Sequence, residues 1–171
     1  MTKHRAFIAL GANLGNVLES FREAIQLLTN QDVQLERCSS AYQTPALVDK
    51  PSDEELPPYW NAVIEVSTVL EPAALLHLMQ SIENQLGRVR HKRWESRTMD
   101  LDLVLFGNSI IKSEDLNVPH PEMHKRTFVL EPLAEIAGEC VVPGQNKSVL
   151  QLLKELPRTA NDVMERKKNW L

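Results

Sequence analysis

The sequence predicts an α+β domain in which helices pack on an antiparallel sheet. Segments that alternate between apolar and polar residues, as strands do, are followed by segments whose apolar residues recur every three or four positions, as in helices. Hydrophobic residues make up 43% of the chain and charged residues 25%, which is typical of a folded globular protein. Because 171 residues suit one domain, we expect residues 1–171 to form a single domain with one site.

The predicted elements follow one another in the order strand, helix, strand, strand, helix, strand. Asn16 is a suitable helix cap, Pro72 suits the first turn of a helix, and Gly87 ends that helix. We expect strands at 5–10, 33–42, 59–70 and 98–106, and helices at 16–30 and 72–87. This βαββαβ order is the ferredoxin-like plan, with both helices on one face of the sheet.

The rest of the chain adds smaller elements to this plan. Residues 43–58, rich in Pro, Asp and Glu, read as a long loop. A turn at Gly107 should lead the strand at 98–106 to a short partner strand at 109–112. Two C-terminal helices are expected at 127–137, where Pro132 should limit the helix, and at 148–156.

Charge and cysteine content restrict the function classes. The net charge of −4 argues against a protein whose main task is to coat nucleic acid. No apolar run approaches the length of a membrane span, and the N-terminus lacks the apolar core of a signal peptide. Cys38 and Cys140 stand far apart without a metal or redox pairing. We therefore expect a cytoplasmic protein that binds neither membrane nor nucleic acid. Apart from these observations, we expect a monomer.

Two carboxylates mark the strand TMDLDLVLF. Its period of two places Asp100 and Asp102 on one face, with their α-carbons about 6.6 Å apart. Carboxylates at this spacing suit one magnesium ion or a pair of them. The other reading is a solvated strand face, but Val104 and Phe106 should continue the acidic face, leaving Met99, Leu101, Leu103 and Leu105 on the opposite one.

A basic run leads directly into this acidic strand. Five cations lie within ten positions, interrupted by Trp94 and Glu95: Arg88, Arg90, Lys92, Arg93 and Arg97. Such runs are often solvated loops, yet guanidinium groups beside a metal site could clamp phosphates. Trp94 could stack on a flat ring or simply pack the loop. Metal, basic clamps and a held hydroxyl are the parts that phosphoryl-type transfer requires.

Other motifs point away from zinc and from a phosphate loop. His120 and His124 have the spacing of a zinc helix, but prolines flank His120 and the HExxH pattern is absent. The segment GANLGN lacks the GK[ST] of a Walker loop, so we read it as a tight turn with a helix cap.

The chain resembles the 6-hydroxymethyl-7,8-dihydropterin pyrophosphokinases of folate biosynthesis, which are ATP-dependent diphosphokinases. The resemblance runs nearly end to end through IALGANLGN, YQTPAL, YWNAV, IENQLGRVR, RWESRTMDLDLVLFG and VPHPEMHKRTFVLEPL. It implies a ferredoxin-like fold and an attack by the pterin hydroxyl on the β-phosphorus of ATP, with AMP leaving. It also implies that Asp100 and Asp102 hold two Mg²⁺ ions with the ATP.

The resemblance assigns roles to matching positions. The nucleotide would contact Gln80, Glu83, Arg88, Arg90, Trp94, Arg97, His120 and Arg126, of which Arg88 and Arg97 would be the catalytic clamps beside Asp100 and Asp102. The pterin would be held by Thr44, Pro45, Leu47, Tyr59, Asn61, Trp94 and Phe128. A flat ring with polar edges suits aromatic side chains and an amide such as Asn61. From the residues alone, Tyr59 and Phe128 would be ordinary core residues.

The segments at 43–58 and 88–97 resemble the family's mobile loops, which close over substrates and exclude water. The chain departs from the usual pattern at Ala12, Val48, Glu95, Ser96 and Asp115. Glu95 adds a negative charge between the clamps, so we expect it to affect nucleotide affinity or closure. Glu95→Gly should then change the turnover number or the ATP dissociation constant.

Two alternatives remain from the sequence. The same βαββαβ order underlies the RRM, an RNA-binding module, although the basic-Gly-aromatic run of that module is missing. Another Mg-dependent nucleotidyl or phosphoryl transferase would use the same acids and arginines. Only the TPAL, WNA and TFVL segments separate it from the pterin enzyme.

Overall fold

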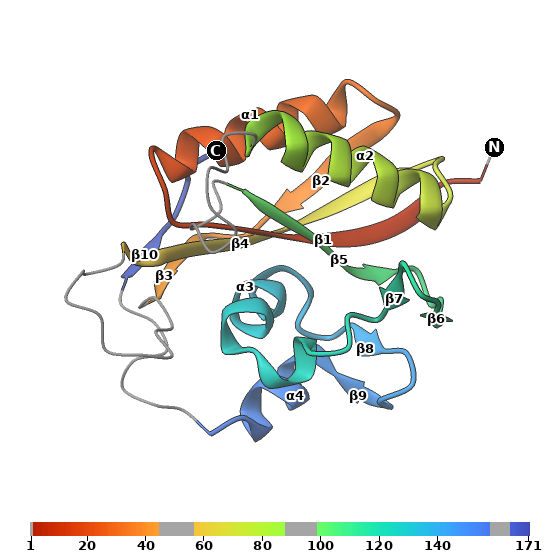
Figure 1. Ribbon diagram of the computed structural model, residues 1–171. Coiled ribbons are helices and arrows are strands. Elements are labelled where there is room, and N and C mark those ends of the chain that lie inside the picture. The colour runs from red at the N-terminus through yellow and green to blue at the C-terminus, as the bar shows by residue number, and fades with distance from the viewer. Residues whose placement is uncertain (1, 45–56, 88–98, 158–164) are drawn as a thin grey trace.

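The computed structural model describes residues 2–44, 57–87, 99–157 and 165–171, and its main feature is a six-stranded antiparallel sheet. Strands follow the order β10-β3-β4-β1-β5, and β2 also pairs with β4. Helices α1 and α2 cover one face, while α3 and α4 lie on the other (Figure 1). The strands of this sheet are β1 (His4–Ala12), β2 (Val33–Cys38), β3 (Ala41–Thr44), β4 (Tyr59–Thr68), β5 (Asp100–Phe106) and β10 (Glu165–Lys167).

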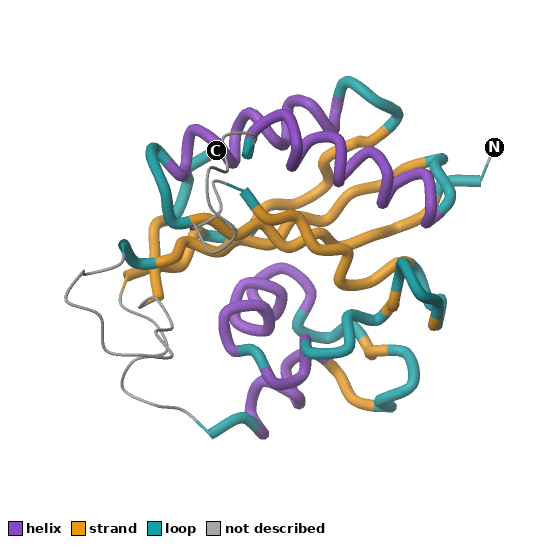
Figure 2. The backbone as a smooth tube through the Cα atoms, viewed as in Figure 1, coloured by secondary structure: helices purple, strands orange, loops and turns teal. Residues whose placement is uncertain are grey.

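The other elements are helices and two small hairpin sheets. The helices are α1 (Val17–Thr29), α2 (Pro72–Leu86), a 3-10 turn (Met123–Lys125), α3 (Thr127–Ala137) and α4 (Val149–Glu155). The small sheets pair β6 (Ile111–Lys112) with β7 (Asn117–Val118) and β8 (Val141–Val142) with β9 (Lys147–Ser148). Figure 2 shows how the helices flank the central sheet. The ferredoxin-like arrangement of β1, α1, β2–β3, β4, α2 and β5 is confirmed.

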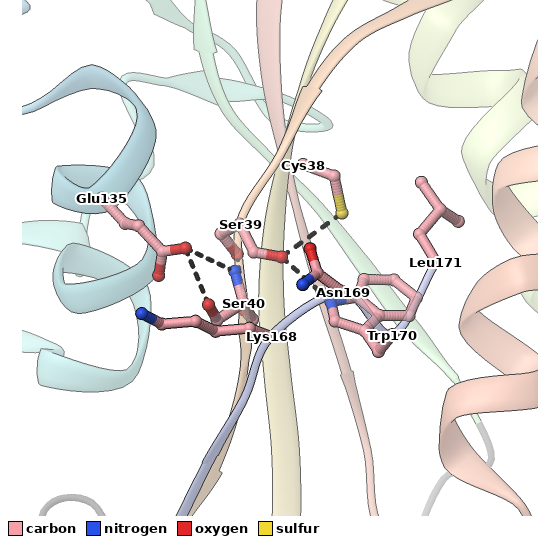
Figure 3. A pocket seen from close by; sticks show the side chains of 8 residues that line it. All are labelled: Cys38, Ser39, Ser40, Glu135, Lys168, Asn169, Trp170 and Leu171. Carbon is pink, nitrogen blue, oxygen red and sulfur yellow. Dashed lines mark hydrogen bonds between the residues drawn. The ribbon is translucent and has the colours of Figure 1, made fainter.

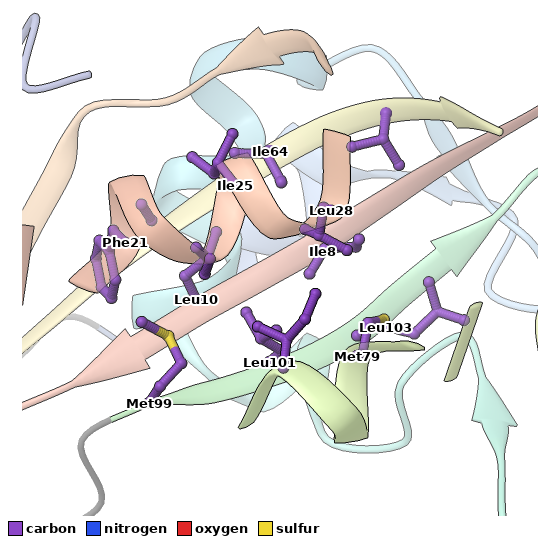
Figure 4. Packing of buried hydrophobic residues seen from close by; sticks show 14 of the residues in the cluster. Ile8, Leu10, Phe21, Ile25, Leu28, Ile64, Met79, Met99, Leu101 and Leu103 are labelled. Atoms are coloured by element: carbon purple, nitrogen blue, oxygen red, sulfur yellow. The ribbon is translucent and has the colours of Figure 1, made fainter. Parts of the chain in front are cut away.

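Local signals explain where the first two helices begin and end. The Asn16 side chain accepts a hydrogen bond from the Glu19 N–H at 3.3 Å, which caps α1. Pro72 occupies the start of α2, and the Gly87 N–H closes its end on the Glu83 carbonyl. The apolar stripes of both helices pack on one face of β1, β4 and β5, where Phe21 and Met79 are fully buried (Figure 4).

A second core lies on the opposite face of the sheet. It joins Phe7 of β1, Val63 of β4 and Val104 of β5 to the apolar residues of α3 and α4. Strands β1 and β4 are therefore covered on both faces, which explains why their sequences are nearly continuous apolar runs. This second face also carries the predicted acids.

The expected second strand, 33–42, is in fact two strands that both pair with β4. The chain bends at Ser39, whose N–H donates to the Val63 carbonyl while its hydroxyl accepts from the Val63 N–H, both at 2.9 Å. The Ser39 carbonyl is left to accept the indole N–H of Trp170 at 2.9 Å. The Ser39 hydroxyl thus takes the place of a main-chain acceptor for the Val63 N–H, and the strand is interrupted there.

A β-bulge corrects the predicted faces of β5. The register passes from Phe7 opposite Leu105 to Ile8 opposite Leu103, so Val104 is the extra residue. Beyond the bulge the faces reverse: Leu105 joins the α3 core and Phe106 the α1 core, whereas the sequence predicted the opposite. Met99, Leu101 and Leu103 precede the bulge and lie on the α1 and α2 face, as predicted.

Two further expectations were wrong. The segment after Gly107 does not pair with β5, because β6 pairs with β7 outside the main sheet. Pro132 does not limit the C-terminal helix, since α3 continues to Ala137 around this buried proline. The proline gives up one helical hydrogen bond, and its ring is buried. The helix expected at 148–156 is confirmed as α4, capped by Ser148.

The C-terminal segment returns to the sheet, a feature that the sequence analysis did not anticipate. Strand β10 pairs with β3, and Trp170 is buried edge-on against Phe21 of α1, with ring centroids 5.6 Å apart. Arg22 donates to the Trp170 carbonyl at 2.8 Å. Within the described ranges, no helix has the length and apolar character needed to cross a membrane.

Candidate active site

The two acids lie on β5, at an edge of the sheet, with their side chains on the α3 face. Asp100 is opposite Gly11 and Asp102 is opposite Ala9, which borders the α3 core. Directly opposed residues share a face, so both carboxylates project to this side. Asp100 is half-buried and Asp102 is exposed.

The register connects this acidic edge with the residues expected to bind the pterin. Gly11 of β1 stands opposite both Asp100 of β5 and Asn61 of β4, and Asn61 stands opposite Tyr42 of β3. These four residues form one row across the sheet, and the Asn61 side chain is 9% exposed. Asp100 and Asn61, which are far apart in sequence, are thus separated in the sheet by Gly11 alone.

Thr44 and Tyr59 extend this arrangement toward the end of the sheet. They stand opposite each other in the sheet. Thr44 lies two residues after Tyr42, and Tyr59 lies two residues before Asn61, so both side chains are on the same face as the row. Thr44 is buried and Tyr59 is half-buried. The structure therefore brings three of the predicted pterin residues together on the α3 side of β3 and β4.

His120 is held beside the acids by the bulge in β5. The His120 N–H donates to the carbonyl of Val104 at 3.0 Å, and its Nδ1 accepts from the Glu122 N–H at 3.1 Å. Burial lowers the pKa of His120, opposed by the negative charge of Asp102 and assisted by the positive charge of Arg126. Asp102 and Arg126 are thus both close enough to His120 to act on its charge.

The beginning of α3 adds the aromatic residue predicted for this site. Arg126 precedes the helix, and its guanidinium carbon lies 5.6 Å from the centroid of the Phe128 ring. Phe128 packs on the edge of the α3 core, as does Ala9, the register partner of Asp102. The start of α3 thus lies over the same face of the sheet as the acids.

Gln80 and Glu83, also expected in the site, belong to the helix on the opposite face of the sheet. They lie one turn apart on α2, which covers the opposite face of the sheet. Glu83 reaches the free edge of β5, where its carboxylate accepts the Leu101 N–H at 3.1 Å, while Gln80 is exposed. Leu101 lies between the two acids, so Glu83 supports the strand that carries them.

Six of the predicted site residues lie outside the described residues, together with the departures Val48, Glu95 and Ser96. They are Pro45, Leu47, Arg88, Arg90, Trp94 and Arg97. Their predicted roles stay predictions. The described residues that flank these segments, Thr44 and Asp100 among them, belong to the site described above.

The donor set of β5 fits magnesium. Magnesium in enzymes commonly takes one or two protein carboxylates and completes its octahedron with water and substrate phosphates. Asp100 and Asp102 supply two such carboxylates on one accessible face. In the part of the chain that the structure describes, no group of three or more His, Cys, Asp or Glu could hold a metal ion, as a metal cage built only from protein ligands would require.

A polar cluster that the sequence did not reveal joins α3 to β3. Glu135 of α3 accepts hydrogen bonds from the Ser40 N–H and hydroxyl, both at 2.8 Å, and from the hydroxyl of Tyr42. Burial of Glu135 raises its carboxyl pKa, but these bonds and the charge of Arg166 outweigh that effect, so the pKa is lowered. Burial and the bond to Glu135 raise the pKa of Tyr42.

A hollow of about 380 Å³ lies next to this cluster rather than at the acids (Figure 3). It is lined by Cys38, Ser39, Ser40, Glu135, Lys168, Asn169, Trp170 and Leu171. None of the predicted site residues that the structure describes borders it. Because the expected reaction needs the metal-binding carboxylates of Asp100 and Asp102, we place the active site at β5 and along the row across the sheet.

Taken together, a ferredoxin-like sheet with paired carboxylates, a neighbouring histidine and arginine, and an adjoining amide and aromatic set defines a transferase of phosphate-type groups. The model of the 7,8-dihydro-6-hydroxymethylpterin-pyrophosphokinase (HPPK) family matches residues 7–138, and the chain belongs to this family. Its members are diphosphokinases of folate biosynthesis that use ATP as co-substrate.

Curated relatives agree with this assignment. The chain is 42% identical over 151 residues to a 2-amino-4-hydroxy-6-hydroxymethyldihydropteridine pyrophosphokinase of Haemophilus influenzae, covering 88% of this chain and 91% of that protein. It is 46% identical over 135 residues to the Bacillus subtilis protein of the same name, covering 78% of each.

Solved structures show the same fold. The wild-type HPPK-DHPS chain of Plasmodium falciparum, crystallised with pteroate, matches with a TM-score of 0.69 at 14% identity. The match covers 90% of this chain but only 44% of that one, so our chain spans less than half of the Plasmodium protein. At this identity the likeness concerns the fold alone.

Proposed function

We propose that this chain transfers the pyrophosphoryl group of ATP to the hydroxymethyl oxygen of 6-hydroxymethyl-7,8-dihydropterin and releases AMP. The observation that carries the proposal is the row Asn61–Gly11–Asp100. In this row Asn61, expected to bind the pterin, and Asp100, expected to bind metal, lie on one face of the sheet with Gly11 between them. The family to which the chain belongs supports the same reaction. Residues 1–171 would act as one pyrophosphokinase domain, monomeric and cytoplasmic.

The acids and their neighbours would bind the nucleotide end. Asp100 and Asp102 would hold two magnesium ions, which would neutralise the phosphate charge when bound. His120, whose pKa responds to the charges of both Asp102 and Arg126, would contact phosphate oxygens together with Arg126, which offers a forked set of donors. Gln80 and Glu83 would border the nucleotide from α2. From the family resemblance, Arg88, Arg90, Trp94 and Arg97 complete this side.

The other half of the row would hold the pterin. Tyr59 and Phe128 would pack against the flat ring, while Thr44 and Asn61 would bond its polar edge. Pro45, Leu47 and Trp94 would join them according to the resemblance. The hydroxymethyl oxygen forms a bond to the β-phosphorus, the bond between that phosphorus and the bridging oxygen to the α-phosphorus breaks, and the hydroxyl proton is released. The main contribution of the protein is positioning and charge neutralisation.

Product analysis tests the reaction. Native protein, Asp100→Ala, Asp102→Ala and the control Glu23→Ala are incubated with magnesium ATP and the pterin. Glu23 is an exposed acid on α1, on the opposite face of the sheet. AMP and pterin diphosphate should form in the native and control proteins only. ADP in place of AMP would favour simple phosphoryl transfer, and no pterin-dependent product from folded native protein would refute the proposal.

The alternatives carry less support. The RNA-binding reading rested on the element order and on a basic loop in which Trp94 could stack a base, and family membership does not favour it. A different phosphoryl transferase would share the acids, but it would not require the amide of Asn61 in the same row as Asp100.

A further inference from the structure

Gly11 occupies a place in β1 where a glycine is unfavourable for the strand. It lies near the C-terminal end of β1, paired on one side with β4 and on the other with β5, and glycine weakens strands because it has no side chain to pack and is flexible when unfolded. The glycines with positive φ are Gly15, Gly107 and Gly144, and Gly11 is not among them. An alanine could therefore adopt its backbone conformation, so backbone geometry does not explain the glycine.

Space explains it better. A β-carbon built on Gly11 would stand 3.0 Å from Oδ1 of Asn61, closer than side-chain carbons normally approach an oxygen. Its next neighbour, the Trp60 carbonyl oxygen, would be at an ordinary 4.0 Å. The amide of Asn61 thus leans over the main chain of Gly11, toward the strand that carries Asp100.

The Asn61 amide has little freedom to move away from such a methyl group. Asn61 is 9% exposed, and its neighbours along β4, Ala62 and Val63, are fully buried. Displacement by a few tenths of an ångström would tilt the hydrogen-bonding plane of the amide. Recognition of a flat heteroaromatic edge by an amide depends on that plane.

We infer that Gly11 is a positioning residue that determines pterin recognition, because the absence of its side chain allows Asn61 to lie over β1 between the two halves of the site. The inference rests on the proposed function and adds to it. Gly11 contacts neither phosphates nor metal in this account, and it acts through Asn61. The segment GANLGN, which the sequence analysis treated as a turn, thereby contributes to the site.

A double-mutant cycle tests the inference, using Gly11→Ala, Asn61→Ala and the combined variant. In Gly11→Ala the KM for the pterin should rise about tenfold, the effect of one impaired buried hydrogen bond, while the KM for ATP stays within about twofold. In the Asn61→Ala background the same methyl group would meet, among the described residues, only the Trp60 carbonyl at 4.0 Å, so it should change the pterin KM no further.

Stability provides a readout that a purely structural glycine would not give. Alanine restricts the unfolded chain more than glycine, which offsets strain from the contact with Asn61, so Gly11→Ala should change the Tm little while pterin affinity falls. If Gly11→Ala does not fold, the combined variant should recover the Tm of Asn61→Ala, because the clashing oxygen is gone. Failure of that recovery would overturn the inference.

The outcomes separate this inference from the proposed function. If the native chain forms no AMP with the pterin, the proposed function fails before the cycle begins. With active native protein, an unchanged pterin KM in Gly11→Ala overturns the glycine inference alone. Equal increases in pterin KM in both backgrounds would also overturn it, because Gly11 would then act independently of Asn61.

Discussion

Replacing Tyr42 by phenylalanine removes one hydroxyl from the cluster that joins α3 to β3. Tyr42 is 3% exposed, and its hydroxyl donates to the Glu135 carboxylate, which also binds Ser40. A hydrogen bond to a charged group contributes about 1.5 to 3 kcal/mol, and because Glu135 is exposed on its solvent side we expect about 1 to 2 kcal/mol here. For a chain of this size that lowers the Tm by roughly 2 to 8 °C.

The matched control is Ser67→Ala. The Ser67 hydroxyl also donates to a carboxylate, Glu36 at 2.7 Å, but this pair lies on the surface. We expect less than about 0.5 kcal/mol for it, since water replaces the lost bond. Urea unfolding followed by far-UV circular dichroism measures both variants under identical conditions.

The effect of Tyr42→Phe should also depend on pH in a defined direction. The lowered pKa of Glu135 means that its contribution is complete above the ordinary value of 4.5 and is lost as the pH falls through the lower pKa of the folded protein. The raised pKa of Tyr42 keeps the hydroxyl protonated well above its ordinary value of 10.0. The stability difference should therefore be constant between these values and shrink in acid. A difference no larger than that of Ser67→Ala, or one unchanged by acid, would refute the reasoning.

Three further predictions concern the metal, the C-terminal segment and the thiols. Removal of divalent metal with EDTA should abolish AMP formation and excess magnesium should restore it, whereas Asp102→Asn should remain at least about 100-fold less active at any magnesium concentration. Full activity of Asp102→Asn in a coupled AMP assay would contradict the metal assignment. Trp170→Ala should lower the free energy of unfolding by about 3 to 5 kcal/mol, because the indole is buried against Phe21 and bonds the Ser39 carbonyl. Trp170→Phe should lose less, and equal losses from urea titration would count against this packing role. Burial and the charge of Glu135 raise the pKa of Cys38 to about 12, so at pH 8 only about one thiol in 10,000 is ionised, and Cys38 should react with DTNB far more slowly in native than in urea-unfolded protein. Equal rates in the two states would show that the thiol is not protected.

Much of the fold could be predicted because its signals are local. The cap at Asn16, the first-turn proline Pro72 and the apolar periodicity of α1 and α2 depend on residues within a few positions of one another. The expected strands failed where a distant group intervened. Ser39 interrupts the second strand by bonding Val63, and the bulge at Val104 reverses the faces of Leu105 and Phe106.

The candidate site divides in the same way. The spacing of Asp100 and Asp102 within one strand predicted a shared face, and the register confirms it. The proximity of Asn61 to that pair could not be read from spacing, because it depends on β1 lying between β4 and β5. His120 was assigned by resemblance, and its anchor on the Val104 carbonyl exists only because of the bulge.

By itself, the sequence determined the order of the main elements, the helix caps, the acidic strand and, through resemblance, the family of this protein. Only the tertiary structure decided that Gly11 separates Asn61 from Asp100, that Glu135 joins α3 to Tyr42, and that Trp170 packs on Phe21. The physical reason is that hydrogen bonding and periodicity along one segment are set by covalent neighbours. Register, bulges and cross-strand contacts are set by the packing of segments remote in the chain.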